Sequence, residues 1–348
     1  MTIKNHHIVP GVYLRYFSCN SQEKREKRTI FSINLTKCPY KIEPKKIDKL
    51  TKKHFYSFRK NDQQKYDDTI EVSNQKYENE WTVIVEEIKN LVAQNQNNLF
   101  YNFRTFENNE LSFKLKQSIA NFFWRVEARR MEIDCFFRFQ LSLEKKSIDE
   151  KELKIMTKAH HLREMGLMVG RTFLSFCEKK IFIVFSPIPI FIASDNPIIA
   201  MDGDQHTRTN ILNPKSIIFS AITPKIAVLI TPCKRYKHNY SSINDIEKML
   251  KVNSKKNINS NIDEEMILKK INFCNQIELK SANYNYKYVH MNPMLIEAKD
   301  WLFSNNQQLL KDCLHLMPLR AKYRPRIINY PSIFVSSRVN FLNECLKE

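Results

Sequence analysis

The chain has 348 residues, with 56 Lys and Arg against 37 Asp and Glu, which gives a formal net charge of +19. It contains only four glycines, whereas an average chain of this length carries about 24. Dinucleotide-binding loops and P-loops need several closely spaced glycines, so the composition argues against both classes of nucleotide-binding enzyme. Hydrophobic residues make up 43% of the chain, enough for a sizeable core.

The N-terminus and the cysteines favour a cytoplasmic protein with no membrane partner. Residues 1–17 contain no continuous apolar run of the kind found in secretory signals. The most apolar stretch, 181–200, is interrupted by prolines and polar residues, whereas a membrane span needs about 20 unbroken apolar residues. The eight cysteines are scattered, with no C-x-x-C pair, which is typical of free thiols in a reducing compartment.

The positive charge is concentrated near the N-terminus. Residues 1–60 hold 15 Lys and Arg against 4 Asp and Glu, a net charge of +11 out of the total +19. Most of it lies in two clusters, 24–28 and 45–53. Such a concentration attracts phosphate backbones, which makes Lys45 and Lys46 candidates for nucleic-acid contacts. A solvated loop followed by a solvated helix face would give the same composition.

The first half of the chain is predicted to become helical after a short strand-containing start. The periodicity predicts, in chain order, an amphipathic piece at 12–17, a strand at 29–35, a short helix or turn at 49–58, one or two helices within 67–93, a loop at 94–98, one long helix at 111–143 and another at 149–180.

After residue 180 the pattern changes to short β-branched and aromatic runs separated by prolines. It predicts strands at 181–185, 190–193, 217–221 and 226–230, a polar loop at 254–261, a helix at 263–280 and a strand at 284–289. We therefore expect a single α+β domain over 1–348, with a helical middle and a largely antiparallel or mixed sheet formed by the N-terminal strand and the C-terminal half. Its parts are a basic segment 1–60, a helical region 61–180, a strand-rich region 181–290 and a tail 291–348.

The sharpest local motif is the run from His6 to Pro10, H-H-I-V-P. Two histidines before a hydrophobic pair are similar to the opening of His-Asn-His nucleases, in which a histidine is the general base and a metal neutralises the phosphate. Such nucleases place a second histidine on a following helix, about 20 to 30 residues on, and here the next histidine is His54. The alternative is that His6 and His7 cap a buried N-terminal segment.

A second motif, S-D-N-P at 194–197, follows a predicted strand. It places the carboxylate of Asp195 and the amide of Asn196 at a strand end, where many sites are built. The alternative is an Asx-turn, in which both side chains bond their own backbone before the proline.

Several charged residues share predicted helix faces. Glu71 and Glu78 are seven residues apart, and Arg125 and Arg129 are four apart, so each pair lies on one side of its helix. Such carboxylates hold a divalent metal, or they pair with the arginines in a buried ion network. The group of His160, His161 and Glu164 resembles a metal-binding pair, but surface helices produce such patterns by chance.

Taken together, these motifs resemble a bacterial family known as domain of unknown function 4238. The family opens with H-H-[YIV]-[VIL]-P-x-x-[YF]-L-x-x-F, matched here by residues 6–17. It continues with a strand, a lysine-rich stretch, an F-Y pair as at 55–56, two helical glutamates seven apart, a helix ending in arginine as at Arg129, and F-I-x-S-D-N-P as at 191–197. The chain departs from it at Ile8 and Gly11, where aromatic and larger residues are commoner.

The resemblance implies a bacterial protein of the anti-phage defence type that acts on nucleic acid. Under this hypothesis it is a metal-dependent nuclease that uses Mg²⁺ or Mn²⁺. The residues involved would be His6, His7 and Asp195 for catalysis, Glu71, Glu78 and Asp195 for the metal, and Arg15, Arg129, Asn196, Lys45 and Lys46 for the substrate. Two alternatives remain: a non-enzymatic nucleic-acid-binding or sensor module in which the same residues form a structural network, and a small-molecule hydrolase or nucleotide-binding enzyme.

Overall fold

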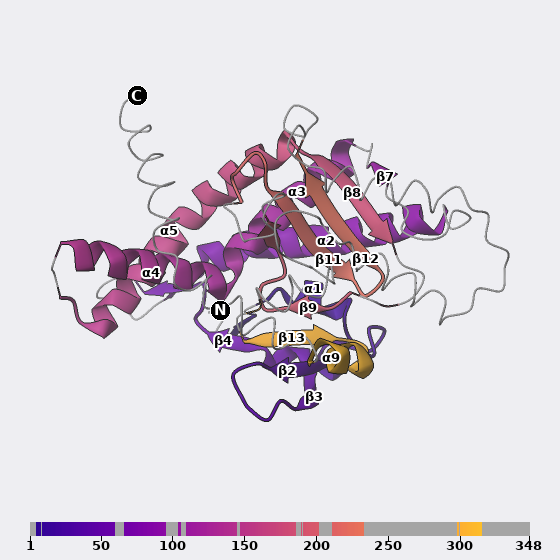
Figure 1. The fold of residues 1–348 in the computed structure, drawn as a ribbon, viewed down its shortest axis with the longest axis horizontal. Coiled ribbons are helices and arrows are strands. Elements are labelled where there is room, and N and C mark those ends of the chain that lie inside the picture. Colours follow the sequence, from indigo (N-terminus) through magenta and orange to yellow (C-terminus); the bar gives the residue numbers. More distant parts are fainter. Residues whose placement is uncertain are drawn as a thin grey trace, which may run out of the picture.

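The computed structural model describes residues 5–7, 9–59, 66–94, 104–105, 109–144, 147–185, 189, 191–201, 211–232, 298 and 300–314 (Figure 1). The loop, helix and strand predicted at 254–261, 263–280 and 284–289 lie outside these residues.

The N-terminal region is built around short strands. Strand β1 (Asn5–His7), which carries the two histidines, pairs antiparallel with β4 (Thr51–Lys53). Between them lie α1 (Gly11–Arg15), a 3-10 turn η1 (Arg25–Lys27), β2 (Thr29–Asn34), β3 (Ile42–Lys46) and a second 3-10 turn η2 (Ile47–Lys49). The strand predicted at 29–35 is confirmed. The segment at 49–58 begins at the end of η2 and continues as β4, so part of it is a strand.

The helical middle begins with α2 (Thr69–Ala93), one continuous helix. The long helix predicted at 111–143 is wrong, because the chain forms two helices, α3 (Asn109–Arg125) and α4 (Glu127–Leu143). They are separated by Val126, whose backbone is extended (φ −77°, ψ 155°).

The break between α3 and α4 is held by two side chains from elsewhere. The hydroxyl of Tyr56 donates to the carbonyl of Arg125 at 2.7 Å. Nε2 of His161 donates to the carbonyl of Trp124 at 2.7 Å. Both carbonyls belong to the last turn of α3, where intrahelical partners run out. The break therefore depends on tertiary contacts and not on a local proline or glycine.

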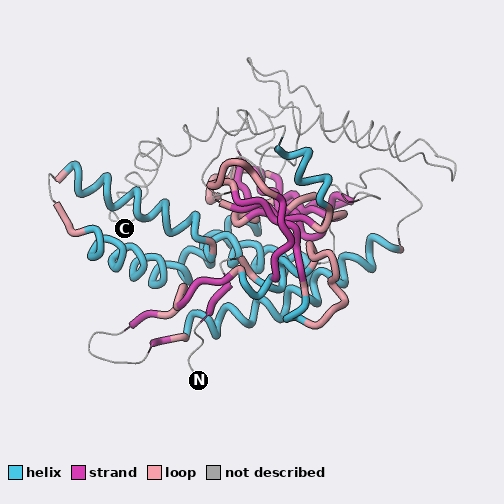
Figure 2. The backbone as a smooth tube through the Cα atoms, turned by 90° about the horizontal axis from the view of Figure 1, so that it is seen from below, coloured by secondary structure: helices cyan, strands magenta, loops and turns pink. Residues whose placement is uncertain are grey.

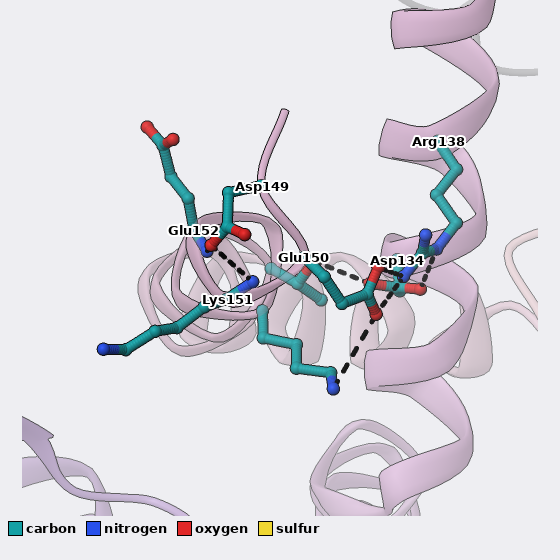
Figure 3. A network of polar contacts seen from close by, with 8 residues as sticks. Asp134, Arg138, Asp149, Glu150, Lys151 and Glu152 are labelled. Atoms are coloured by element: carbon teal, nitrogen blue, oxygen red, sulfur yellow. Dashed lines mark hydrogen bonds and ion pairs between the residues drawn. The ribbon is translucent and has the colours of Figure 1, made fainter. Parts of the chain in front are cut away.

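Helix α5 (Glu150–Cys177) follows and confirms the prediction at 149–180. Its first turn is capped by Asp149, whose carboxylate accepts from the amides of Lys151 and Glu152 at 2.9 and 3.2 Å. Beside this cap, Arg138 of α4 donates to Asp134 and to Glu150, each at 2.7 Å, which ties α4 to α5 (Figure 3).

The strand-rich half forms a five-stranded sheet in the order β10-β11-β12-β8-β7. Its strands are β7 (Arg104–Thr105), β8 (Lys180–Phe185), β10 (Ile199–Met201), β11 (Ile217–Thr223) and β12 (Ile226–Thr231), and each neighbouring pair is antiparallel. Every residue of β12 is buried, as expected for an apolar strand covered on both faces. In Figures 1 and 2 the helices α2 and α3 lie along one side of these strands.

A second, four-stranded sheet joins the two ends of the described chain. Its order is β3-β2-β13-β9, with β9 (Ala193–Ser194) and β13 (Trp301–Ser304) beside the N-terminal β2, all antiparallel. Helix α9 (Gln307–Leu314) follows β13. The predicted α+β class, with a helical middle and a sheet that combines the N-terminal strand with the C-terminal half, is confirmed.

Two further features complete the fold. The small strands β5 (Phe58–Arg59) and β6 (Tyr66–Asp67) pair with each other just before α2. Buried apolar side chains from Val9 to Cys313 form one continuous cluster that draws on both main sheets and the helices. Among the described helices, none has the length and apolar character needed to cross a membrane.

Candidate functional site: a buried polar network at the α3–α4 break

The candidate site is centred on Arg125, the last residue of α3. Its side chain is 1% exposed. Nη2 donates to Glu78 Oε1 at 2.7 Å and lies 4.0 Å from Glu71 Oε2, so the two predicted glutamates share one guanidinium. The guanidinium also lies over the ring of Tyr56, 5.2 Å from its centroid. Helical spacing places Glu71 and Glu78 on the same side of α2, as the sequence predicted, and that side faces an arginine.

The α2–α3 seam around Arg125 contains buried polar atoms that lack hydrogen-bond partners among the described residues. These atoms are Glu71 Oε2, Asn74 Nδ2, Asn121 Oδ1, and Nε and Nη1 of Arg125. Besides the hydrogen bond from Arg125 to Glu78, Asn121 Nδ2 donates to Asn74 Oδ1 across the seam at 3.2 Å. Buried polar groups in native proteins are nearly always paired, so a group of unpaired atoms in one place makes the seam a candidate site.

Burial changes the pKa values of the ionisable side chains in the seam. Desolvation raises the pKa of Glu71 to about 7, although the charge of Arg125 opposes part of this rise. The pKa of Arg125 is lowered by burial, but the neighbouring Tyr56, Glu78 and Glu71 more than offset this, so it stays above its ordinary value. The guanidinium is therefore charged while Glu71 exchanges its proton near neutral pH, which is where general bases operate.

His6 joins the network through the segment 55–57. Its Nδ1 accepts from the amide of Tyr56 at 2.7 Å, and its ring stacks on that of Tyr56. A neutral ring with this acceptor carries its proton on Nε2, which lies 3.3 Å from Ser57 Oγ. Ser57 in turn donates to Asp68 at 2.5 Å. In this arrangement His6 anchors the segment before α2, and its role as a general base stays a prediction.

Arg129 and Asn196, both predicted to bind substrate, are brought together. Nη2 of Arg129 donates to Asn196 Oδ1 at 3.1 Å, and Nη1 donates to Glu132 at 2.5 Å. The guanidinium lies 4.0 Å from the ring centroid of Phe123. The hydrogen bond from Arg129 to Asn196 links α4 to the S-D-N-P turn, 67 residues further along the chain.

Asp195 is directed to the backbone of the other sheet. Its Oδ2 accepts from the amides of Asp300 and Trp301 at 2.7 and 3.1 Å, and its own amide donates to the Trp301 carbonyl at 3.2 Å. Ser194 closes the local turn through its hydroxyl, which accepts from the Asn196 amide at 3.1 Å. The carboxylate of Asp195 therefore fixes the entry into β13.

The contacts that the structure shows for the remaining predicted residues are with groups other than Arg125. His7 Nε2 is 3.9 Å from Asp48 Oδ1, and a Cβ added to Gly11 would lie 3.0 Å from the same nitrogen. Lys45 covers the ring of Trp301 at 3.9 Å, and Lys46 is exposed at the end of β3. Arg15, at the end of α1, lies over the ring of Tyr16.

The donor set of this site does not resemble a metal centre. Within the described part of the chain, no three His, Cys, Asp or Glu side chains are grouped so that they could hold a metal ion. Arg125 already donates to Glu78 and lies 4.0 Å from Glu71, and Asp195 accepts from backbone amides. A divalent metal at these three carboxylates stays a prediction, and it would have to displace Arg125 from both glutamates.

Sequence reasoning missed several members of the network. Tyr56 enters the sequence analysis only within the F-Y pair at 55–56, and no motif points to Ser57 or Arg130. Nη2 of Arg130 donates to the carbonyl of Phe55 at 2.8 Å and reaches His161 Nδ1 at 3.5 Å. Burial, with a further contribution from Arg130, lowers the pKa of His161 to about 3, so this histidine is neutral. Both its ring nitrogens are engaged, which does not suit the metal pair considered for it.

Comparison with known proteins places the chain in a family. A family model described as a protein of unknown function, DUF4238, matches residues 5–293. The chain belongs to the DUF4238 family. The match begins at β1 and includes Arg125, Arg129 and the S-D-N-P turn, so the network lies within what DUF4238 describes. No curated protein and no solved structure matched the chain.

Proposed function

We propose that this DUF4238 protein is a defence-type protein that binds nucleic acid through an exposed basic face, and that the buried network around Arg125 holds that face in place. The basic face consists of the exposed residues Lys24, Lys27, Lys46 and Lys49. Lysines presented together on one surface attract phosphate backbones and raise the rate of encounter.

The observation that carries this proposal is that the fold merges two basic clusters that are separate in the sequence. The amide of Ile47 donates to the carbonyl of Arg28 at 3.1 Å, which joins η2 to the end of η1. In the same region Lys46 of β3 lies opposite Thr29 of β2. Asp48, the acidic residue between Lys46 and Lys49, lies with Oδ1 3.9 Å from Nε2 of His7.

The basic face is connected to the buried network through the histidine motif. Strand β4, which follows η2, pairs with β1 so that Lys52 lies opposite His6 and Thr51 lies opposite His7. His6 then bonds the backbone of Tyr56, and Tyr56 bonds Arg125. A rigid base of this kind lowers the entropic cost of presenting several lysines to one polyanion.

Binding measurements on a charge-deleted chain test the proposal. The variant Lys24→Ala/Lys27→Ala/Lys46→Ala/Lys49→Ala is compared with Lys76→Ala/Lys89→Ala/Lys151→Ala/Lys154→Ala, which removes the same charge from exposed positions of α2 and α5. Fluorescence anisotropy with duplex DNA and with single-stranded RNA is expected to show a loss of affinity on the order of tenfold or more for the first variant only. Equal losses in the two variants would contradict a localised face.

Metal-dependent nuclease activity is the second candidate, and the raised pKa of Glu71 beside Arg125 is the observation that favours it. A buried carboxylate with a pKa of about 7 suits a general base for water. Incubation of DNA and RNA with Mg²⁺ or Mn²⁺ is expected to give cleavage that Glu71→Gln abolishes without weakening binding. Intact nucleic acid after incubation with the wild-type chain would rule this candidate out and leave the binding module.

A further inference from the structure

Two cationic side chains, one from α4 and one from α5, meet at the turn that follows β4. Lys158 of α5 donates from Nζ to the carbonyl of His54 at 2.7 Å, and Arg130 of α4 donates from Nη2 to the next carbonyl, that of Phe55, at 2.8 Å. His54 has a φ of 50°, in the left-handed region that residues other than glycine seldom adopt. Three segments far apart in the sequence therefore place two positive charges at one strained turn. We call Arg130 and Lys158 the cation pair.

The cation pair has no carboxylate partner in the part of the chain that the structure describes. No acidic side chain there lies within salt-bridge distance of either member. The acidic residues of α4 on either side of Arg130 are engaged with other cations. Glu127, one turn before it, pairs with Lys52, and Asp134, one turn after it, pairs with Arg138 (Figure 3). The positive charge of the pair is therefore met only by backbone carbonyls and aromatic rings.

Burial makes the lack of a counter-charge unfavourable. The Nε atom of Arg130 is buried and makes no hydrogen bond with the described residues. Burial, followed by the charge of Arg130, lowers the pKa of Lys158 to about 8. Burial also lowers the pKa of Arg130 to about 10, although Tyr56 and Glu127 oppose part of this change. Two neighbouring cations that have lost part of their hydration are stabilised by an anion more than by carbonyl dipoles alone.

We propose that the cation pair is a binding site for a phosphate group, held between Arg130 and Lys158. Lys158 is partly exposed, and its ammonium uses one donor on His54, which leaves two donors for a ligand. Arg130 uses Nη2 on Phe55 and His161, which leaves Nε and Nη1. Arginine and lysine are the side chains that bind phosphate best, the first through several fixed donors and the second as a point charge.

The charge of the pair indicates which kind of phosphate fits. A terminal phosphate carries a charge of about −1.5 to −2 at neutral pH, which matches two cations, whereas an internal phosphodiester carries a single negative charge. The site therefore suits inorganic phosphate or a phosphate monoester. A small phosphorylated molecule and a phosphorylated end of a nucleic acid both present this group. The inference goes beyond the proposed function, because neither Arg130 nor Lys158 belongs to the basic face.

Titration of the full-length chain with inorganic phosphate at constant ionic strength, followed by phosphorus NMR, tests the proposal. The phosphate resonance is expected to broaden in the presence of the wild-type chain. Lys158→Met keeps the apolar stem and removes the ammonium, so it is expected to weaken binding by about tenfold or more. Lys154→Met is the matched control, since it removes the same charge one turn earlier on α5 from a side chain that is 71% exposed, and it is expected to bind phosphate as the wild type does.

No broadening with the wild-type chain, or equal broadening with the wild type and Lys158→Met, would overturn the proposal. Circular dichroism verifies that each variant is folded, and Arg130→Lys, which keeps the charge but loses the guanidinium donors, decides by the same criteria if Lys158→Met does not fold.

Two short oligonucleotides, with and without a terminal phosphate, identify the source of the phosphate group. Tighter binding of the phosphorylated one, with the preference lost in Lys158→Met, assigns the site to a nucleic-acid end. Equal affinities, together with binding of inorganic phosphate, assign it to a small phosphorylated molecule. The variant that lacks the four lysines of the basic face is expected to keep its phosphate binding, so the two proposals fail independently.

Discussion

Two arginines in this protein each meet two carboxylates, and the surroundings of the two groups differ. Arg125 is 1% exposed and contacts Glu78 and Glu71 in the α2–α3 seam. Arg138 is 45% exposed and contacts Asp134 and Glu150 where α4 meets α5 (Figure 3). Near Arg125 several buried polar atoms lack hydrogen-bond partners among the described residues, whereas water competes for every group around Arg138. Because of this difference in burial, we expect the first network to contribute far more to stability than the second.

Removing each arginine in turn gives the largest expected difference between the two networks. Arg125→Met leaves Glu71 and Glu78 without their cation in a buried seam, so the free energy of unfolding is expected to fall by about 3–5 kcal/mol. Arg138→Met is the matched control, and its loss is expected to be far smaller because exposed ion pairs contribute little. Urea unfolding followed by circular dichroism measures both. Similar losses in the two variants would contradict the comparison.

Asp195 differs from the carboxylates of both arginine networks, because it accepts its hydrogen bonds from backbone amides. Asp195→Ala removes two partly buried hydrogen bonds at the start of β13 and is expected to cost about 2–4 kcal/mol of unfolding free energy. Asp195→Asn keeps an acceptor oxygen and is expected to recover at least half of that loss. Thermal unfolding and a cleavage assay are run on the same samples. If the role of Asp195 were catalytic, Asp195→Asn would leave stability intact and abolish any hydrolysis.

Tyr56→Phe sharpens the account of the α3–α4 break. The substitution removes only the hydroxyl that donates to the buried carbonyl of Arg125, so it is expected to cost about 1–3 kcal/mol. Hydrogen exchange should locate the change at 122–128, because the carbonyl that lost its partner lies there. Tyr40→Phe, which alters a partly buried tyrosine away from the network, is the control. Equal effects of the two substitutions would show that the break does not depend on Tyr56.

Glu71→Gln tests the seam through its pH dependence, with the smallest expected effect. The pKa of Glu71 is about 7 in the fold and 4.5 in the reference state, so the folded chain retains a proton that the unfolded chain releases between these values. The free energy of unfolding therefore falls as pH rises from about 4.5 to 7. Glu71→Gln should flatten this decline.

Glu110 is an exposed carboxylate whose pKa is shifted in the opposite direction, so it serves as a control for Glu71. The hydrogen bond from Lys114 lowers the pKa of Glu110, so its contribution to stability appears as pH rises. Glu110→Gln should therefore leave the decline between pH 4.5 and 7 in place. Denaturant titrations at pH 5, 6 and 7.5 measure all three chains, and an unchanged slope in Glu71→Gln would contradict the raised pKa.

Much of the fold follows from local patterns in the sequence. The apolar periodicity of α2 and α5 predicts both helices, since each has one buried side along its length. The β-branched runs predict β8, β11 and β12 because these strands are largely buried. The helix break at Val126 is not visible, because no proline or glycine marks it and the side chains that hold it, Tyr56 and His161, come from other segments.

The site is predictable only in part for the same reason. Helical spacing correctly places Glu71 and Glu78 on one face, but it does not identify the residue opposite them, which is Arg125. The S-D-N-P motif signals a turn. The amides that donate to Asp195, however, belong to Asp300 and Trp301, which lie 105 and 106 positions later in the chain. Residue type and spacing select candidate polar groups, and their partners are set by tertiary packing.

The salt dependence of nucleic-acid binding tests the central claim most directly, because it counts the phosphates that the basic face neutralises. The logarithm of the binding constant for duplex DNA falls with the logarithm of salt concentration with a slope of about −0.9 per contact. Removing Lys24, Lys27, Lys46 and Lys49 together should therefore make the slope less negative by about 3 to 4. The variant that lacks Lys76, Lys89, Lys151 and Lys154 should keep the wild-type slope. An unchanged slope in the basic-face variant would contradict the account.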